Sequence, residues 1–217
     1  MIITKFGHAC VRLEKNGRRI VIDPGLMTPE PQAMDGAEAI LITHEHFDHF
    51  EADRLIKAAA NDSGLEMYTC LGVARHLTQL GDRVHVVHNG DKFSAGGFEI
   101  SVLGEKHHFS HPDFPPADNV GFMVDGEAFH PGDALTFVNA PTLLVPGQAP
   151  WMTFPDLIGY LRKMKPKRAY AIHDGLMNEW GIKVLDNVLK GEAEKLGIEI
   201  RRLESGESVE VWATNDR

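Results

Sequence analysis

A buried strand that runs directly into a cluster of histidines is the feature that most restricts how this chain can fold. Residues 39–43 are apolar or β-branched, which is typical of a strand covered on both faces. His44, His46, Asp48 and His49 follow within the next six positions. Loops at the ends of strands in α/β sheets usually carry functional side chains. The segment therefore predicts a functional site at the end of a central strand.

The residue types in this cluster favour metal binding. Alternation in an extended segment puts His44 and His46 on the same side, whereas Asp48 and His49 lie near the start of a helix predicted over residues 51–60. Imidazole nitrogens and carboxylate oxygens are ligands for Zn²⁺ and related divalent ions. A polar loop with histidines by chance, or a single structural metal, is the competing interpretation.

Composition indicates an ordinary globular protein. The 217 residues, 43% of them apolar, suit a single domain spanning residues 1–217 or two intimate halves with a large core. No apolar run is long enough to span a bilayer, and no secretory signal is visible at the start. Two cysteines make a disulfide framework an unfavoured interpretation and fit a reducing cytosol, so we expect a cytoplasmic protein.

Charge argues against nucleic acid as a partner. The formal net charge is −9, and no long block of one sign occurs. A binder of nucleic acid needs a basic footprint, and the one local basic run, at residues 163–168, reads more simply as a solvated helix end. A small-molecule substrate is the expected partner, and a homo-oligomer formed through exposed apolar surface is compatible with the sequence.

The order of predicted elements indicates an α/β fold. Each half of the chain has a β-rich run followed by β-loop-helix units, with helices predicted over residues 51–60, 73–80, 154–164 and 182–196. Strands are predicted at residues 120–124, 128–130, 142–145 and 168–172, among others. This order suggests a four-layer sandwich of two mixed β-sheets packed face to face, with helices outside.

Three more ligand-type residues follow predicted strands in the later part of the chain. His107 comes after residues 100–103, Asp133 after residues 128–130, and His173 after residues 170–172. Polar residues at the ends of several strands can converge on one site. Alternation from Ile100 would also allow His108 as the ligand in the His-rich loop, and His111 is a third candidate there.

Other residues are expected near such a site. His8 is either a neighbour of the ligands or a buried, hydrogen-bonded histidine, and Asp23 is expected to accept the second N–H of a ligand histidine. Trp151 and Phe154 could line an apolar pocket or belong to the core. Asp174 is expected to cap a turn or to support His173.

The chain closely resembles the metallo-β-lactamase-fold superfamily of hydrolases. The matching residues are His44-x-His46-x-Asp48-His49, a later His after a strand, Gly132-Asp133 and the late His173. The opening Gly7-His8-Ala9-Cys10 and the segment Ile22-Asp23-Pro24-Gly25 look like the branch that contains ascorbate-phosphate lactonases and N-acyl-phosphatidylethanolamine phospholipases.

The resemblance implies a dinuclear metal site. Its first metal would be held by His44, His46 and His107, its second by Asp48, His49 and His173, and Asp133 would bridge the two. The resemblance favours His107 over His108, which leaves His111 for substrate contact or protonation of the leaving group. Zn²⁺ is expected because histidine dominates, while the two carboxylates also permit Mn²⁺ or Fe.

The predicted function is hydrolysis of an ester-type bond in a small substrate: a lactone, a carboxylic ester or a phosphodiester. Water activated by two metals would be the nucleophile, with Asp48, Asp133 and His111 as the catalytic candidates. The alternatives are a nuclease of the same fold that cleaves RNA, a mononuclear-iron redox enzyme, and a non-catalytic binding protein with a vestigial site.

Overall fold

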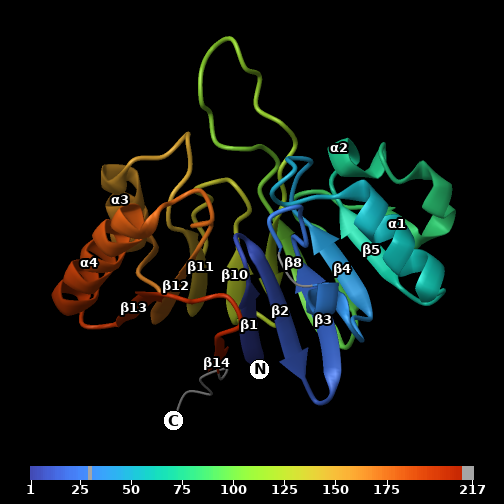
Figure 1. The fold of residues 1–217 in the computed structure, drawn as a ribbon, viewed down its shortest axis with the longest axis horizontal. Coiled ribbons are helices and arrows are strands. Elements are labelled where there is room, and N and C mark those ends of the chain that lie inside the picture. Colours follow the sequence, from blue (N-terminus) through green and yellow to red (C-terminus); the bar gives the residue numbers. More distant parts are fainter. Residues whose placement is uncertain (29–30, 212–217) are drawn as a thin grey trace.

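The computed structural model describes residues 1–28 and 31–211 of the chain. Within these residues two mixed, seven-stranded sheets pack face to face, and helices lie on the two outer faces (Figure 1). The predicted four-layer α/β sandwich is therefore confirmed. No helix in the described ranges combines the length and the apolar character needed to cross a bilayer.

The first sheet is built mainly from the first half of the chain. Its spatial order is β14 (Ser208–Glu210), β1 (Ile2–Phe6), β2 (Cys10–Lys15), β3 (Arg18–Ile22), β4 (Ala39–Ile42), β5 (Glu66–Thr69) and β6 (Val84–Val86). The strands from β14 to β3 pair antiparallel, and those from β3 to β6 pair parallel. All four residues of β4 are buried, as expected for a strand covered on both faces.

The second sheet repeats this arrangement with the second half of the chain. Its order is β13 (Glu199–Arg202), β12 (Arg168–Ile172), β11 (Thr142–Pro146), β10 (Ala128–His130), β9 (Gly121–Val124), β8 (Phe98–Leu103) and β7 (Lys92–Ala95). The strands from β13 to β10 are parallel, and those from β10 to β7 are antiparallel. The C-terminal β14 leaves this half and pairs with β1 of the first sheet.

Apolar side chains hold the layers together. One core cluster joins the sheets and includes Ile42 and Leu41 from the first sheet and Val102 and Phe122 from the second. The other fills the space between the second sheet and the helices α3 (Phe154–Met164) and α4 (Glu179–Leu196). The helix α1 (Ala52–Asn61) lies on the outer side of the first sheet (Figure 1).

α1 is shifted by one residue from the range predicted from the sequence, and two other helices differ more. The predicted helix over residues 73–80 is instead one turn, α2 (Leu71–Ala74), followed by the 3-10 segment η2 (Thr78–Arg83). Val73, Leu77 and Leu80 are all buried, so the helical spacing identified core positions. The backbone nevertheless leaves the α conformation at Leu77, with φ −119° and ψ 20°.

α4 begins three residues earlier than predicted because its N-cap lies upstream. The Asn178 side chain accepts hydrogen bonds from the backbone N–H groups of Trp180 and Gly181, at 3.1 and 2.9 Å. An asparagine in this position satisfies N–H groups that have no partner inside the helix. α3 has the predicted range, and a short 3-10 turn, η1 (Pro31–Met34), precedes β4.

Candidate metal centre

The predicted ligand residues lie at one end of the two sheets. Thr43 and His44 follow β4, Asp133 follows β10 after a short turn, and His173 follows β12. His107 lies in the long loop between β8 and β9, which projects beyond the sheets (Figure 1). Ligands at carboxyl ends of strands can converge because these ends meet at the same edge of a sheet.

Tight backbone packing joins the segments that carry these residues. A Cβ on Gly25 would lie 2.3 Å from the backbone carbon of Asp48, so only glycine lets this loop approach the Asp48–His49 turn. A Cβ on Gly132 would lie 2.3 Å from Asn119 Oδ1, and its φ is +63°. The Gly132-Asp133 pair of the sequence is thereby explained by space as well as by conformation.

Two groups of candidate ligands form at this edge. The first group is His44, His46, His107 and Asp133, and the second group is His8, Asp48, His49 and His173. Within each group, one ligand atom per residue lies within 4.8 Å of the others. Asp48 and His49 belong to a turn that immediately precedes α1, near the start of that helix as expected.

Asp133 lies between the two groups. Its Oδ1 is 3.1 Å from His49 Nε2 and 3.2 Å from His173 Nε2, while its Oδ2 is 3.4 Å from His107 Nε2. One carboxylate thus faces histidines of both groups. This position fits the bridging role that the family resemblance implies.

The hydrogen bonds of the histidines leave Nε2 available. In three of them Nδ1 faces an oxygen that can only accept: the Asp23 carboxylate for His49 at 2.7 Å, the His108 carbonyl for His107 at 2.7 Å, and the Gln148 carbonyl for His173 at 2.5 Å. Nδ1 must therefore carry the proton, and in a neutral ring Nε2 then carries the lone pair.

Thr43 favours the same tautomer of His44, with the proton on Nδ1 and the lone pair on Nε2. The Thr43 hydroxyl donates to Asp23 Oδ2 at 2.7 Å, so its oxygen can accept from His44 Nδ1, which is 2.9 Å away. Asp23 thus supports one histidine of each group, directly for His49 and through Thr43 for His44. The expectation that Asp23 accepts from a ligand histidine agrees with this geometry.

Several inward-facing atoms of the site have no hydrogen-bond partner. They are the Nε2 atoms of His44, His49, His107 and His173 and Oδ1 of Asp133. A buried polar atom without a partner costs about 1–3 kcal/mol, so this convergence needs a compensating group. Imidazole nitrogen and carboxylate oxygen are the donors that divalent transition ions prefer, and the residues therefore fit a metal centre.

His8 has a different hydrogen-bond pattern. Its Nδ1 accepts from the backbone N–H of Gly175 at 2.8 Å, which leaves the proton of the neutral ring on Nε2. Nε2 then donates to Asp48 Oδ2 at 3.2 Å. His8 therefore supports Asp48 and lacks a free lone pair of its own.

Electrostatics keeps the carboxylates ionised. Burial alone would raise the pKa of Asp133, but the imidazoles of His49 and His173 outweigh it and hold that pKa well below its usual range. Burial likewise opposes ionisation of Asp48, and the neighbouring imidazoles of His173 and His8 prevail and lower its pKa. An ionised carboxylate is the form that binds a cation.

The pKa values of the histidines in the site shift in different directions. Burial would lower the pKa of His173, but Asp133 and Asp48 outweigh it and raise the pKa to about 9. Burial, followed by the neighbouring His49, holds the pKa of His44 well below its usual range. His173 also has a φ of 60°, a left-handed conformation that is uncommon for a residue with a side chain and is kept mainly at functional sites.

The structure separates the three histidines of the β8–β9 loop. His107 joins the first group, whereas the His108 ring lies against Trp151 at 4.9 Å and its backbone N–H donates to the Asp133 carbonyl at 2.7 Å. His111 lies outside both groups, in an exposed part of the loop where its Nδ1 accepts from the Asp113 N–H. Its predicted catalytic role stays a prediction.

Two contacts of the site carry no clear sequence signal. The Gln148 carbonyl that holds His173 is a backbone group, which any residue would supply. The Trp151 indole N–H donates to Asp133 Oδ2 at 2.9 Å, although the sequence indicates only a pocket or core role for this residue. Asp174, expected near His173, is paired with the buried Lys5 at 2.6 Å.

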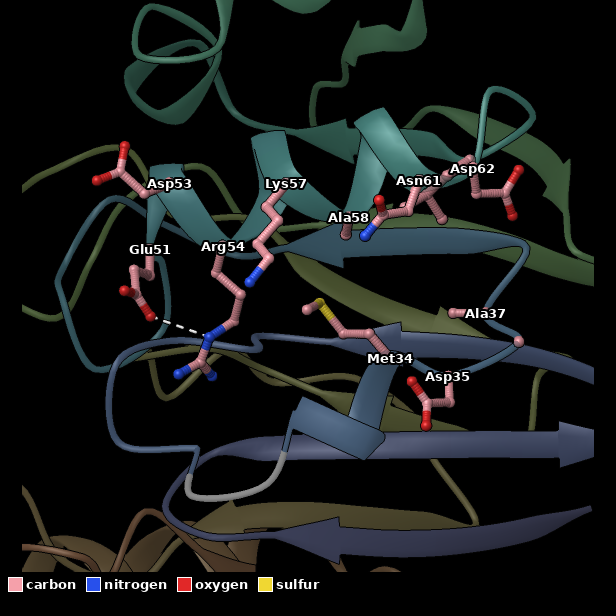
Figure 2. A pocket seen from close by; sticks show the side chains of 12 residues that line it. Met34, Asp35, Ala37, Glu51, Asp53, Arg54, Lys57, Ala58, Asn61 and Asp62 are labelled. Carbon is pink, nitrogen blue, oxygen red and sulfur yellow. Dashed lines mark ion pairs between the residues drawn. The ribbon is translucent and has the colours of Figure 1, made fainter.

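The cavities of the molecule differ in their relation to this centre. One cavity of about 540 Å³ lies between α1 and η1, where Arg54 pairs with Glu51 at 3.0 Å (Figure 2), and none of the predicted ligands lines it. Another, of about 420 Å³, is lined by Gln148, Met152, Phe154, Met177 and neighbouring residues. It adjoins the centre through Gln148, whose carbonyl accepts from His173.

Comparison with known proteins agrees with this architecture. The family model described as the β-lactamase superfamily domain matches residues 2–173. Protein Rv0786c of Mycobacterium tuberculosis is 34% identical over 185 residues, which cover 82% of this chain and 85% of that protein. A UPF0173 metal-dependent hydrolase of Carboxydothermus hydrogenoformans is 29% identical over 231 residues, covering 96% and 99%.

The fold has counterparts among solved structures. Igni18, a metallo hydrolase from the archaeon Ignicoccus hospitalis, superposes with a TM-score of 0.71 at 21% identity and covers 96% of this chain and 97% of its own. The matched residues 2–173 contain every predicted ligand, from His44 to His173. The chain therefore belongs to the β-lactamase superfamily domain family, and its two-sheet sandwich is the metallo-β-lactamase fold.

Proposed function

We propose that the chain is a metal-dependent hydrolase that uses two divalent ions to cleave an ester-type bond of a small substrate. Hydrolysis as the reaction class rests on family membership and on relatives named metal-dependent hydrolases. The two-ion part rests on one observation: Nε2 atoms without hydrogen-bond partners, from both groups, face the Asp133 carboxylate, whose Oδ1 also lacks a partner.

In this proposal His44, His46 and His107 hold the first ion, and Asp48, His49 and His173 hold the second. Asp133 contributes to both because it faces histidines of each group. When bound, such ions lower the pKa of water to about 7 and polarise the bond under attack. Three protein ligands and a shared carboxylate leave positions open for water and substrate, as in catalytic sites and unlike closed structural ones.

The chain's own residues prepare the site. Asp48 and Asp133 are held ionised, Asp23 and two carbonyls fix the direction of the rings, and His8 fixes Asp48. Neither cysteine belongs to the two groups, and burial raises the pKa of Cys10 to about 12 and also raises that of Cys70. Water is therefore the proposed nucleophile.

Zn²⁺ is the proposed metal because five of the seven predicted ligands are imidazoles: His44, His46, His49, His107 and His173. Imidazole suits Zn²⁺, Fe and other transition ions, while the two carboxylates, Asp48 and Asp133, also permit Mn²⁺. We further propose a cytoplasmic location, since both cysteines are free and buried.

A small substrate fits the surroundings of the site better than a nucleic acid. The cavity of about 420 Å³ beside Gln148 is within the range of about 300–1,000 Å³ that is typical of small-molecule sites. The net charge of −9 disfavours a polyanion. A lactone, a carboxylic ester or a phosphodiester is proposed, with His111 contacting the substrate from the projecting loop.

Metal analysis combined with a substrate panel tests this proposal. Wild type, Asp133→Ala and the control Asp82→Ala, at an exposed position, are assayed with lactones, carboxylic esters and phosphodiesters. We expect about two metal ions per chain in wild type and in the control, and loss of activity in Asp133→Ala. A wild-type chain that binds no metal contradicts the whole proposal, whereas a fully metallated and active Asp133→Ala contradicts the shared role of Asp133. Bound iron with oxygen-dependent turnover would instead indicate the redox alternative.

A further inference from the structure

The Trp151 side chain makes a specific contact with the metal centre. Its indole N–H donates to Asp133 Oδ2 at 2.9 Å, from the loop that follows β11 to the residue that follows β10. The inference drawn from this contact rests on the proposed metal site. Indole N–H is a donor only and does not titrate, so Trp151 is neither a metal ligand nor a proton carrier.

The main chain of Asp133 is fixed independently of Trp151. Its N–H donates to Asn119 Oδ1 at 3.0 Å, and its carbonyl accepts from the His108 N–H at 2.7 Å. These hydrogen bonds fix the main-chain position of Asp133 but do not fix the rotation of its carboxylate. The Trp151 N–H donates a hydrogen bond to that carboxylate and occupies Oδ2.

The other oxygen is left for the metal centre. Asp133 Oδ1 has no hydrogen-bond partner and lies 3.1 and 3.2 Å from the Nε2 atoms of His49 and His173. A different carboxylate rotation would move Oδ1 away from these nitrogens. The hydrogen bond to Oδ2 therefore keeps Oδ1 directed at the Nε2 atoms of His49 and His173.

The indole ring is itself held by the β8–β9 loop. It packs edge-on against the His107 ring at 5.6 Å and lies over the His108 ring at 4.9 Å. Its position is thereby coupled to a predicted ligand, His107, as well as to Asp133. A group fixed in this way is suited to orienting a ligand, and loss of such support typically weakens metal binding about 10–100-fold.

We propose that Trp151 is a positioning residue that anchors Asp133 Oδ2 through its indole N–H, so that Oδ1 is presented to the metal position of the second group. Simple packing by a large aromatic ring is the competing explanation. The two explanations predict different effects of substitution. Positioning requires the indole N–H, whereas packing requires the size of the aromatic ring.

Two substitutions separate these demands. Trp151→Phe keeps an aromatic ring but removes the N–H. Trp151→His removes the outer ring but keeps a five-membered ring whose Nε2–H corresponds in position to the indole N–H. Trp180→Phe is the matched control, since Trp180 is 66% exposed and its ring contacts Lys183.

Metal affinity is measured by competition with a chelator, together with metal stoichiometry, kcat and KM, and the melting temperature of each metal-stripped variant. We expect Trp151→Phe to lose affinity about 10–100-fold and to lose kcat with little change in KM, while its metal-stripped form melts like wild type. Trp151→His should keep two metals and stay within about threefold of wild-type affinity, as should Trp180→Phe.

Wild-type affinity and kcat in Trp151→Phe would overturn the inference. So would a Trp151→His variant that loses as much affinity as Trp151→Phe, or a metal-stripped Trp151→Phe that melts well below wild type, since either result assigns a packing role. If wild type binds no metal, the proposed function fails first. If Asp133→Ala loses metal but Trp151→Phe does not, only the role of Trp151 fails.

Discussion

The two groups of candidate ligands differ in how far they are buried. All four residues of the second group are buried, with His8, His49 and His173 each 1% exposed. The first group contains one exposed member, His46, beside the 59% exposed Phe47. Solvent and substrate can therefore approach the first group more easily than the second.

The groups also differ in the support behind them. The second group is backed by Asp23 on His49, by His8 on Asp48, and by the buried Lys5–Asp174 pair next to His173. The first group is supported by the Thr43 hydroxyl on His44 and by Trp151 on Asp133, and its His107 lies in a long projecting loop. The comparison suggests a rigid second position and a first position where substrate exchanges with solvent.

Removing one ligand from each group should have the largest effect. His49→Ala and His46→Ala should each reduce the metal content from about two ions to about one. Activity should fall by more than the roughly 100-fold typical of residues that only support ligands. Metal content and kcat/KM measure both effects. Loss of both ions in either variant would show that the groups bind metal as one unit and would remove the distinction between them.

Lys5→Met tests the support behind the second group. The substitution leaves the Asp174 carboxylate buried without its closest cation, and breaking such a pair costs about 3–5 kcal/mol. We expect about 3 kcal/mol in the free energy of unfolding by denaturant, because Arg202 lies 3.5 Å from the same carboxylate. Lys57→Met, at an exposed site on α1, is the control. An unchanged free energy of unfolding would mean that the Lys5–Asp174 pair does not stabilise the structure behind the second group.

Chelator kinetics should reveal the difference in exposure. With excess chelator we expect two phases of metal release, with about one ion in each, and the faster phase should come from the first group because His46 is exposed. His46→Ala should remove the fast phase and His49→Ala the slow one. A single phase in wild type would argue that both positions have equal access to solvent.

His111→Ala should have the smallest effect. The residue lies in the exposed part of the β8–β9 loop and outside both groups, so we expect it to make at most one substrate hydrogen bond. Its loss should lower kcat/KM by no more than about tenfold, in line with a net hydrogen bond of about 0.5–1.5 kcal/mol. A fall of about 10²–10⁴-fold would instead assign it the role of a general acid.

The segment from Ile40 to His49 determined much of this picture by local pattern alone. An all-apolar strand followed by His-x-His-x-Asp-His needs no long-range information, because alternation and residue type already predict a metal site at a strand end. The order of elements likewise predicted the two-sheet sandwich, since strand and helix periodicity are local properties.

The β8–β9 loop shows where this reasoning stops. Alternation allowed His108 and only the family resemblance favoured His107, because the alternation is extrapolated from a strand that ends at Leu103. Beyond that point the chain follows hydrogen bonds to distant residues, such as His107 N–H to the Ala117 carbonyl. The helix predicted over residues 73–80 fails similarly, since its apolar spacing identified buried positions without fixing the backbone at Leu77.

The sequence by itself determined the residue types of the centre and the strands that present them, because these depend on neighbours in the chain. Only the tertiary structure decided which histidine nitrogen is free, that His8 donates to Asp48, and that Trp151 holds Asp133. Each of these depends on a hydrogen bond between segments that are far apart in sequence, such as His8 and Gly175. The periodicity of the sequence does not predict such a pairing, because the hydrogen bond forms only when the two sheets have packed together.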